Sequence, residues 1–316
     1  MSTRVEQRGG RVSLAGRDFL SLHDFAPEEV SLLVEDALRW KNGQDGRPLV
    51  RKNVALLFLK PSTRTRVAFD VAVSDLGGHP VALQGGEVQL ARGETVADTA
   101  RVLSQLVDGV VIRAFAHRDI EEFARFATIP VVNALTDLLH PSQALADLLT
   151  LLERFGSLRR LRVTYVGDGN NVCHSLAFAA AKTGMHLRVA TPTNFAPDPM
   201  VWAAAAEDAR STGAQLELLN DPREAVRGAD AVYTDTWVSM GFEPTADARR
   251  RALEPYQVSS ALLALAAPHV IFMHDLPAHR GEEVTDEVMD GPSSVIFQQA
   301  GNRLHAAKAI LAAIIA

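Results

Sequence analysis

The stretch VALLFLKPSTRTRVAFDVAVSDL, residues 54–76, contains the structural unit from which the fold can be predicted. Its first part, Val54–Leu59, is a short apolar run typical of a buried strand, and Thr65–Leu76 has a helical pattern. Short apolar runs alternate with longer helical patterns over most of the chain. This alternation predicts an α/β protein whose parallel sheets are covered by helices and bind ligands at the carboxyl ends of the strands.

The expected elements run through the whole chain. The expected strands are Val54–Leu59, Pro80–Leu83, Gly109–Arg113, Pro130–Asn133, Arg162–Val166, Leu187–Ala190, Gln215–Leu218, Ala231–Thr234 and Val270–Met273. The expected helices include Thr65–Leu76, Val96–Leu106, Gln143–Phe155, Val172–Thr183, Pro199–Ser211 and the Ala-rich terminal stretch Asn302–Ile315. Residues 237–257 have the weakest secondary-structure pattern and exceed the usual length of a connection, which makes them a candidate mobile lid.

The length of 316 residues predicts two domains, since one domain usually takes about 100–200 residues. We expect the division at the long helix that follows His140. Residues 1–140 would form the first domain and residues 141–299 the second, with the C-terminal helix, residues 300–316, returning to the first domain.

Composition excludes several classes of protein. The chain is 47% hydrophobic, which excludes wholesale disorder, and its net charge of -6 gives no general attraction to nucleic acid. The single cysteine, Cys173, excludes an internal disulfide, and no apolar run approaches the ~18 residues of a membrane span. Residues 1–11 show no signal peptide. We therefore expect a soluble, cytoplasmic protein that binds neither nucleic acid nor membranes.

Residues 60–66, KPSTRTR, follow the first strand and open a helix. A helix N-terminus favours anions, because its first N–H groups are unpaired and its dipole end is positive. Three hydroxyl groups add donors, and the guanidinium groups of Arg64 and Arg66 fit phosphate oxygens. Alternatively, Ser62 or Thr63 only caps the helix and the arginines are solvated. The density of anion-binding groups favours a phosphate site.

A second cluster, residues 140–143 (HPSQ), lies at another junction between a loop and a helix. The side chains of His140 and Gln143 can both donate to a carbonyl oxygen that gains negative charge in a transition state. Arg113 ends a buried strand, so its charge should emerge at the carboxyl edge, and Gln89 could reach the same region. In the alternative interpretation, His140 only ends a segment and Gln143 is an ordinary residue of the first helical turn.

Residues 167–171, GDGNN, follow another strand and enter a helix. The third glycine of the dinucleotide motif GxGxxG would fall at Val172, so a tight turn that presents amide side chains is favoured over a nucleotide cofactor. Asp235 also follows a strand and suits a substrate ammonium, and Ser239 with the Met240 backbone could complete a polar site. Taken singly, Asp235 is better explained as a turn cap and Met240 as a packing residue.

Residues 274–283, HDLPAHRGEE, follow the last strand and combine histidines with carboxylates. His274, His279 and Glu282 have no spacing at which they would converge on an ion. We therefore expect no metal site.

Five motifs occur in order along the chain, and together they resemble the aspartate/ornithine carbamoyltransferase family. They are residues 62–66 (STRTR), 140–143 (HPSQ), 167–171 (GDGNN), 235–241 (DTWVSMG) and 276–283 (LPAHRGEE). The resemblance extends from about Phe19 to the C-terminus. The Asn-Asn and Ser-Met-Gly motifs are similar to those of ornithine carbamoyltransferases rather than aspartate carbamoyltransferases.

The resemblance implies two doubly wound α/β domains with the active site in the cleft between them, and no metal or cofactor. It implies that carbamoyl phosphate and L-ornithine give L-citrulline and phosphate, in arginine biosynthesis or in the arginine deiminase route. The implied carbamoyl-phosphate-binding residues are Ser62, Thr63, Arg64, Thr65, Gln89, Arg113, His140, Gln143, Leu276 and Arg303. The implied ornithine-binding residues are Asn171, Asp235, Ser239 and Met240. The family also implies a homotrimer or a multiple of trimers, with Gln89 near a neighbouring subunit's site.

The catalytic residues implied are Thr65, Arg113, His140 and Asp275. Attack by the neutral δ-amine on carbamoyl phosphate builds negative charge on the carbonyl oxygen, and Thr65, Arg113 and His140 are the donors expected around it. Positioning of the two substrates supplies much of the remaining acceleration. No covalent nucleophile is needed.

The chain departs from the family pattern at two positions. Asp275 stands where ornithine carbamoyltransferases usually have a cysteine near the reacting amine, and Gly301 stands where glutamate is common. A carboxylate at position 275 has two opposing effects: paired with the ammonium it depletes the nucleophile, whereas as a general base it accepts the proton. Two alternatives follow from Asp275: a carbamoyltransferase for a different amine, and a non-catalytic protein that binds carbamoyl phosphate.

Overall fold

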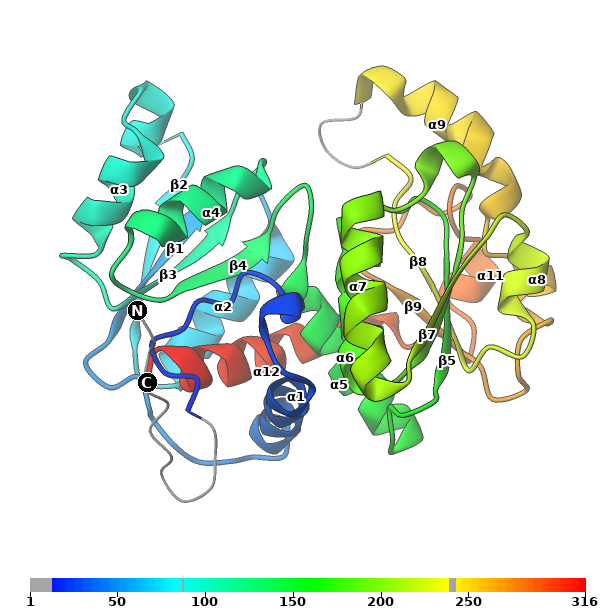
Figure 1. Cartoon of the computed structure of the whole chain (residues 1–316), viewed down its shortest axis with the longest axis horizontal. Helices are drawn as coiled ribbons and strands as arrows, with labels where there is room; N and C mark the ends of the chain where they lie inside the picture. The colour runs from blue at the N-terminus through cyan, green and yellow to red at the C-terminus, as the bar shows by residue number, and fades with distance from the viewer. Residues whose placement is uncertain (1–12, 87, 239–242) are drawn as a thin grey trace. The chain divides into compact units, whose positions relative to one another are not determined.

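The computed structural model describes residues 13–86, 88–238 and 243–316. The chain forms two compact units, each built around its own sheet (Figure 1). The first unit comprises the described residues up to Leu149 together with Asn302–Ala316, and the second comprises Thr150–Gly301. The boundaries lie inside two helices, α5 (Pro141–Phe155) and α12 (Ile296–Ile314).

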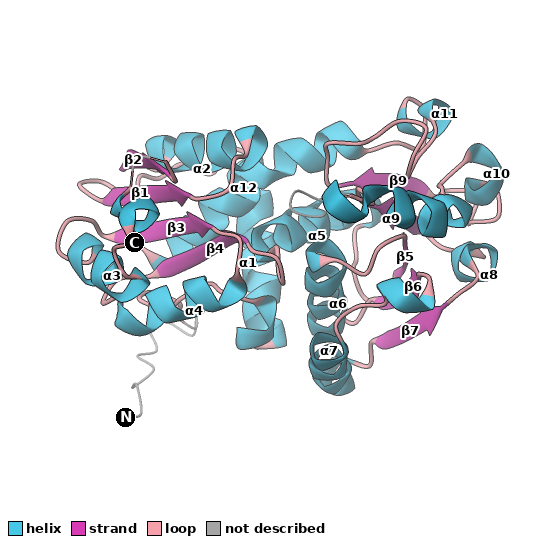
Figure 2. Cartoon of the chain, turned by 90° about the horizontal axis from the view of Figure 1, so that it is seen from above, coloured by secondary structure: helices cyan, strands magenta, loops and turns pink. Residues whose placement is uncertain are grey.

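The first unit has a parallel sheet in the order β2-β1-β3-β4. Its strands are β1 (Asn53–Phe58), β2 (His79–Gln84), β3 (Gly109–Arg113) and β4 (Val131–Leu135). Its helices include α1 (Pro27–Lys41), α2 (Thr63–Asp75), α3 (Val96–Leu103) and α4 (His117–Phe126), with short 3-10 turns η1 (Leu22–Asp24) and η2 (Gln89–Arg92). Helices α3 and α4 cover one face of the sheet, and α2 covers the other together with α12 (Figure 2). Ile112 and Phe123 belong to the core beneath α3 and α4.

The second unit has a parallel sheet in the order β7-β6-β5-β8-β9. Its strands are β5 (Arg162–Val166), β6 (His186–Ala190), β7 (Gln215–Leu219), β8 (Ala231–Thr234) and β9 (Ile271–His274). Its helices include α6 (Asn171–Thr183), α7 (Pro199–Thr212), α8 (Pro222–Val226), α9 (Ala246–Leu253), α10 (Ser260–Leu263) and α11 (Asp286–Met289). Its 3-10 turns include η3 (Thr193–Phe195), η4 (Glu243–Thr245) and η5 (Glu254–Tyr256). Phe272 and Val288 lie in the core that α8, α10 and α11 cover.

Each sheet has a point at which the strand order reverses. In the first unit the chain passes from β1 to β2 on one side and then returns to β3 on the other. In the second unit the corresponding point lies between β5 and β8. Ligands of open α/β sheets bind at such points, beyond the carboxyl ends of the strands. The anion turn after β1, Arg113 at the end of β3, the GDGNN turn after β5 and Asp235 after β8 all occupy these positions.

Every expected strand is present, with ends within two residues of the prediction. The terminal helix begins at Ile296 rather than Asn302. The prediction of weak secondary structure for residues 237–257 is wrong for the part that forms α9 and η5. Alanines and arginines favour a helix there, and Asp247 in the first turn with Arg250 and Arg251 in the last turn suits the helix dipole. The lid prediction falls partly on residues 239–242, which lie outside the described residues. No helix in the described part of the chain is long and apolar enough to span a membrane.

Gly301 lies inside α12, and a Cβ added to it would have no heavy atom within 4 Å. Because glycine is about 1 kcal/mol less favourable than alanine in a helix interior, Gly301→Ala should raise the free energy of unfolding by about that amount. Urea denaturation followed by circular dichroism measures the effect. Gly291→Ala is the matched control, since its Cβ would lie 2.5 Å from the Glu287 carbonyl oxygen and should destabilise the fold. Loss of stability in Gly301→Ala would contradict this account of α12.

Candidate active site

The N-terminus of α2 forms the anion turn of the first unit. Ser62 has an extended backbone, and its Oγ accepts a hydrogen bond from the Thr65 N–H (3.3 Å), so Ser62 caps the helix. Ser62 Oγ also donates to Thr65 Oγ1 (3.1 Å). Capping satisfies only part of the first turn, so the end of α2 keeps its preference for an anion.

The sheet register places Arg113 beside this turn. Phe58, the last residue of β1, pairs with Arg113, the last residue of β3. The N–H groups of Leu59 and Lys60 both donate to the Arg113 carbonyl oxygen (2.9 and 3.4 Å), which holds the turn against β3. The Arg113 side chain is 7% exposed, and its Nη1 donates to Thr65 Oγ1 at 3.5 Å. A buried positive charge and a helix N-terminus therefore converge at one edge of the sheet.

His140 and Gln143 are buried at the start of α5, after β4. Ser142 Oγ lies 3.4 Å from His140 Nδ1. Gln143 Nε2 donates to Asp147 Oδ1 (2.8 Å), one turn further along the same helix. Gln143 Oε1 is buried and accepts no hydrogen bond from the part of the chain that the structure describes. Gln143 therefore presents an acceptor for a ligand N–H.

The remaining predicted carbamoyl-phosphate residues have different surroundings. Arg303 is buried in the part of α12 that belongs to the first unit, and Gln89 is exposed in η2. Leu276 belongs to the second unit. Sequence reasoning did not include Lys60 among the site residues, yet Lys60 is buried and its Nζ lies 5.6 Å from the centre of the Phe115 ring. The position of Lys60 within the KPSTRTR stretch could have indicated that it belongs to the site.

Asp235, after β8, is the centre of the polar groups in the second unit. It is 4% exposed, and its Oδ2 accepts a hydrogen bond from Asn170 Nδ2 (2.8 Å). Asn170 Oδ1 caps α6 by accepting from the N–H groups of Val172 and Cys173 (3.0 and 3.2 Å). The structure thus brings Asn170 against Asp235, while Asn171 is the half-buried first residue of α6.

The charge on Asp235 is strongly disfavoured. Burial, followed by repulsion from the Asp275 carboxylate, raises the pKa of Asp235 to about 7. The charge interaction with His274 and the hydrogen bonds from the Thr236 N–H and from Asn170 only partly oppose this shift. The predicted residues Ser239 and Met240 lie outside the described residues.

Both units match family models. The aspartate/ornithine carbamoyltransferase carbamoyl-P binding domain matches residues 17–153, and the Asp/Orn binding domain of the same family matches residues 159–314. The chain belongs to the aspartate/ornithine carbamoyltransferase family.

Relatives that are 40–52% identical to this chain align with almost all of it. The ornithine carbamoyltransferase of Thermococcus kodakarensis is 52% identical over 307 residues, which are 96% of this chain and 98% of the relative. The solved structure of ornithine carbamoyltransferase from Pyrococcus furiosus is 50% identical with a TM-score of 0.93, covering 96% of this chain and 99% of that one. The anabolic ornithine carbamoyltransferase of Campylobacter jejuni is 40% identical with a TM-score of 0.90, covering 93% and 97%. These structures confirm the predicted fold of two parallel-sheet α/β domains.

Arg249, on α9, joins three segments of the second unit. It forms an ion pair with Asp168 of the GDGNN turn, and its Nε donates to the Trp237 carbonyl oxygen (2.9 Å). Its guanidinium carbon lies 4.8 Å from the centre of the Phe195 ring. Burial raises the pKa of Asp168 to about 6, although Arg249 opposes the shift. Sequence reasoning missed Arg249 because its contact with Asp168 spans 81 positions and α9 was not predicted.

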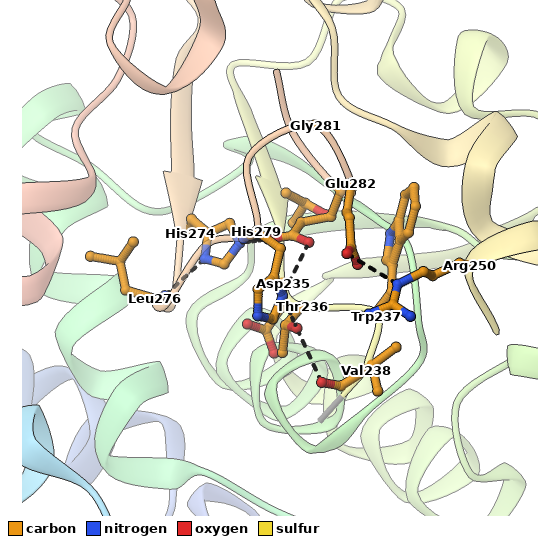
Figure 3. A network of polar contacts seen from close by, with 12 residues as sticks. Asp235, Thr236, Trp237, Val238, Arg250, His274, Leu276, His279, Gly281 and Glu282 are labelled. Carbon is orange, nitrogen blue, oxygen red and sulfur yellow. Dashed lines mark hydrogen bonds and ion pairs between the residues drawn. The ribbon is translucent and has the colours of Figure 1, made fainter. Parts of the chain in front are cut away.

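A network of polar contacts surrounds the end of β9 (Figure 3). His274 Nδ1 accepts a hydrogen bond from the Leu276 N–H (2.8 Å), and His274 Nε2 lies 3.0 Å from Glu283 Oε1. Because Nδ1 is an acceptor, the ring proton belongs on Nε2, where it faces the carboxylate. His274 therefore holds the backbone that follows β9.

His279, Glu282 and Glu283 place one ligand atom each within 4.8 Å of one another. Two residues of the predicted trio His274, His279 and Glu282 belong to this group, and a tight turn brings them together, because the Glu282 N–H donates to the His279 carbonyl oxygen (2.9 Å). His279, Glu282 and Glu283 are a donor set that could hold a metal. Each also contacts the chain itself: His279 bonds Thr236, Glu282 pairs with Arg250, and Glu283 bonds His274.

Asp235→Asn tests the desolvation of the second unit's site. The folded-state pKa of Asp235, about 7, lies above the usual value for an unfolded aspartate. The free energy of unfolding of the wild type should therefore fall as pH rises from the unfolded value toward the folded value. Asparagine has no such titration. The urea midpoint of Asp235→Asn relative to wild type should therefore increase between pH 5 and pH 8, whereas the exposed Asp45→Asn should show no such change. A difference in urea midpoint between Asp235→Asn and wild type that does not change with pH would contradict a free-energy cost of burying the Asp235 carboxylate.

Proposed function

We propose that the protein transfers the carbamoyl group of carbamoyl phosphate to the δ-amine of L-ornithine and releases L-citrulline and phosphate. One observation carries this proposal. The unit matched by the carbamoyl-P binding domain has a cationic helix N-terminus, and the unit matched by the Asp/Orn binding domain has carboxylates at its sheet edge. Relatives of about half identity that cover nearly the whole chain are named ornithine carbamoyltransferases.

The phosphate group would bind at the N-terminus of α2. The backbone N–H groups and hydroxyls of Ser62–Thr65, which include Thr63, supply donors. Arg64, Arg113 and Arg303 would supply positive charge, and planar guanidinium groups suit phosphate oxygens. Negative charge on the departing phosphate is stabilised by the same groups.

The carbamoyl group would bind beside the phosphate. Gln143 Oε1 suits the carbamoyl NH2 as its acceptor, because Gln143 Nε2 already donates to Asp147. His140, Thr65 and Arg113 would donate to the carbonyl oxygen, which becomes negative when the amine attacks. One such donor typically contributes about 3–4 kcal/mol to catalysis.

L-Ornithine would bind to the second unit. Asp235 is the proposed acceptor for the α-ammonium, and Asn171, Ser239 and the Met240 backbone complete the site for the amino-acid end. Leu276 is proposed to complete the carbamoyl-phosphate site from the loop after β9.

We also infer a homotrimer or a multiple of trimers, in which Gln89 lies near a neighbouring subunit's site. A surface hollow of about 660 Å³ beside the anion turn supports this inference. Ser62 and Arg66 line it together with Val67 and Val71, two exposed valines of α2. Exposed apolar side chains with a polar rim are typical of a surface that another chain covers.

The proposed direction is synthesis of citrulline for arginine. The Pyrococcus furiosus relative, 51% identical, is named an anabolic ornithine carbamoyltransferase, which supports biosynthesis over the arginine deiminase route. The cytoplasmic location stays a prediction.

Citrulline formation by the purified protein tests the function. Arg64→Ala should lower kcat/KM for carbamoyl phosphate about 10- to 100-fold, because hydrogen bonds from a charged donor contribute roughly 1.5–3 kcal/mol. Arg118→Ala, on the exposed surface of α4, is the control and should retain wild-type activity. Wild-type protein that forms no more citrulline than Arg64→Ala would contradict the proposal.

A further inference from the structure

The side chain of Gln143 has two unlike ends, a donor and an acceptor, and the fold engages only one of them. Its Nε2 donates to Asp147 Oδ1 (2.8 Å), one turn further along α5. Its Oε1 is buried and accepts no hydrogen bond from the residues that the structure describes. A buried acceptor without a partner costs free energy, so such an atom in a folded protein needs an explanation. A ligand that donates a hydrogen bond to Oε1 is one.

The part of α5 that carries Gln143 and Asp147 is closed to bulk water. All residues from Pro141 to Thr150 are buried, and Gln143 and Asp147 are 1% and 0% exposed. The acceptor for the Gln143 NH2 group therefore has to come from the protein, and Asp147 supplies it.

The backbone at the start of α5 holds this pair in place. The Gln143 N–H donates to the His140 carbonyl oxygen (3.2 Å). Ser142 Oγ donates to the carbonyl oxygen of Ala134 on β4 (3.3 Å), which fixes the first turn of the helix to the preceding strand. Residues four apart on a helix lie on the same face. Gln143 and Asp147 therefore keep the spacing that their hydrogen bond requires.

The pairing of this amide with this carboxylate has one favourable direction. An ionised carboxylate has acceptors but no donor, so the Gln143 NH2 group faces Asp147. The reversed amide would set Gln143 Oε1 against Asp147 Oδ1, two acceptors, and would offer the NH2 group to the ligand instead. Asp147 therefore decides that Gln143 presents an acceptor rather than a donor.

The orientation of this amide bears on which acyl phosphate the site accepts. Carbamoyl phosphate has an NH2 group where acetyl phosphate has a methyl group of similar size. We propose that Asp147 is a positioning residue that makes the site specific for a carbamoyl group, because it holds Gln143 Oε1 in the orientation that accepts the ligand NH2. This proposal rests on the proposed function. Acetyl phosphate would leave Oε1 buried without a donor, and a site built to hydrogen-bond an NH group rejects an analogue that lacks it.

A purely structural role of Asp147 makes a different prediction. Asp147 has further interactions within the fold, so its replacement can also change the stability and the shape of the whole site. Damage of that kind would weaken the binding of all ligands of the site to a similar extent. Loss of the amide orientation weakens only a ligand that donates to Gln143 Oε1. The ratio of two affinities therefore separates the two roles.

Calorimetry with two unreactive analogues tests the proposal. Phosphonoacetamide has a phosphonate, a carbonyl and an NH2 group, and acetonylphosphonate has a methyl group in place of the NH2. The wild type should bind phosphonoacetamide at least about tenfold more tightly, because only this analogue satisfies the buried acceptor. In Asp147→Leu the ratio should fall below about threefold, through weaker binding of phosphonoacetamide alone. A wild type without the preference, or Asp147→Leu that keeps it, would overturn the proposal.

Three further variants show whether Asp147 acts through Gln143. Thr150→Val changes another fully buried polar residue of α5 and should leave the ratio unchanged. Asp147→Ala removes the same acceptor with a smaller side chain and should lose the preference even if Asp147→Leu does not fold. Adding Asp147→Leu to Gln143→Met should cause no further loss of the ratio, since the reading oxygen is already absent. An equal loss in Thr150→Val, or an additional loss in the double variant, would contradict the proposal.

The same binding measurement separates this proposal from the proposed function. Wild type that forms no citrulline, yet shows a preference for phosphonoacetamide that Asp147→Leu abolishes, would sink the function and leave the role of Asp147 in place. Wild type that forms citrulline but binds the two analogues equally would leave the function in place and overturn the role of Asp147.

Discussion

The parallel register of β1 and β3 is the constraint on which the first unit's site depends. It sets Phe58 opposite Arg113, so the strand that ends in a charge lies beside the strand that leads into α2. The interior of such a strand is buried, and a guanidinium can leave it only at the open carboxyl end. A slip of one residue would turn Arg113 to the other face of the sheet and separate it from Thr65. The phosphate site is thus a consequence of strand pairing as much as of the STRTR motif.

Strand register also positions charged side chains in the second unit, but there the charge is negative. Register between β8 and β9 brings Asp235 and Asp275 to one edge, and the Asn170 cap orients the first of them. Carbamoyl phosphate is an anion and ornithine carries two amino groups, so the sign of each site suits the substrate proposed for it. Burial increases the strength of both sites, because poorly solvated charges interact more strongly with a ligand and with each other.

Much of this architecture could be predicted from local patterns. Apolar runs predicted the strands, and residues in the loops that follow them, such as Ser62 and Asp235, could be predicted because ligands bind at the carboxyl edge of such a sheet. Contacts between distant segments could not be predicted in this way. The ion pair of Arg249 with Asp168 depends on where α9 folds, and the hydrogen bond from Asn170 to Asp235 depends on which residue caps α6. A single sequence carries no local signal for either.

The central claim is that one carbon–nitrogen bond forms, between the carbamoyl carbon and the δ-nitrogen of ornithine. Nuclear magnetic resonance of the product made from ¹³C-labelled carbamoyl phosphate and L-ornithine labelled with ¹⁵N at the δ position tests it most directly. The account predicts a ureido carbon signal split by one-bond coupling to ¹⁵N, appearing as inorganic phosphate is released. Release of phosphate with no such coupling, or product that carries the carbamoyl group on the α-nitrogen, would contradict it.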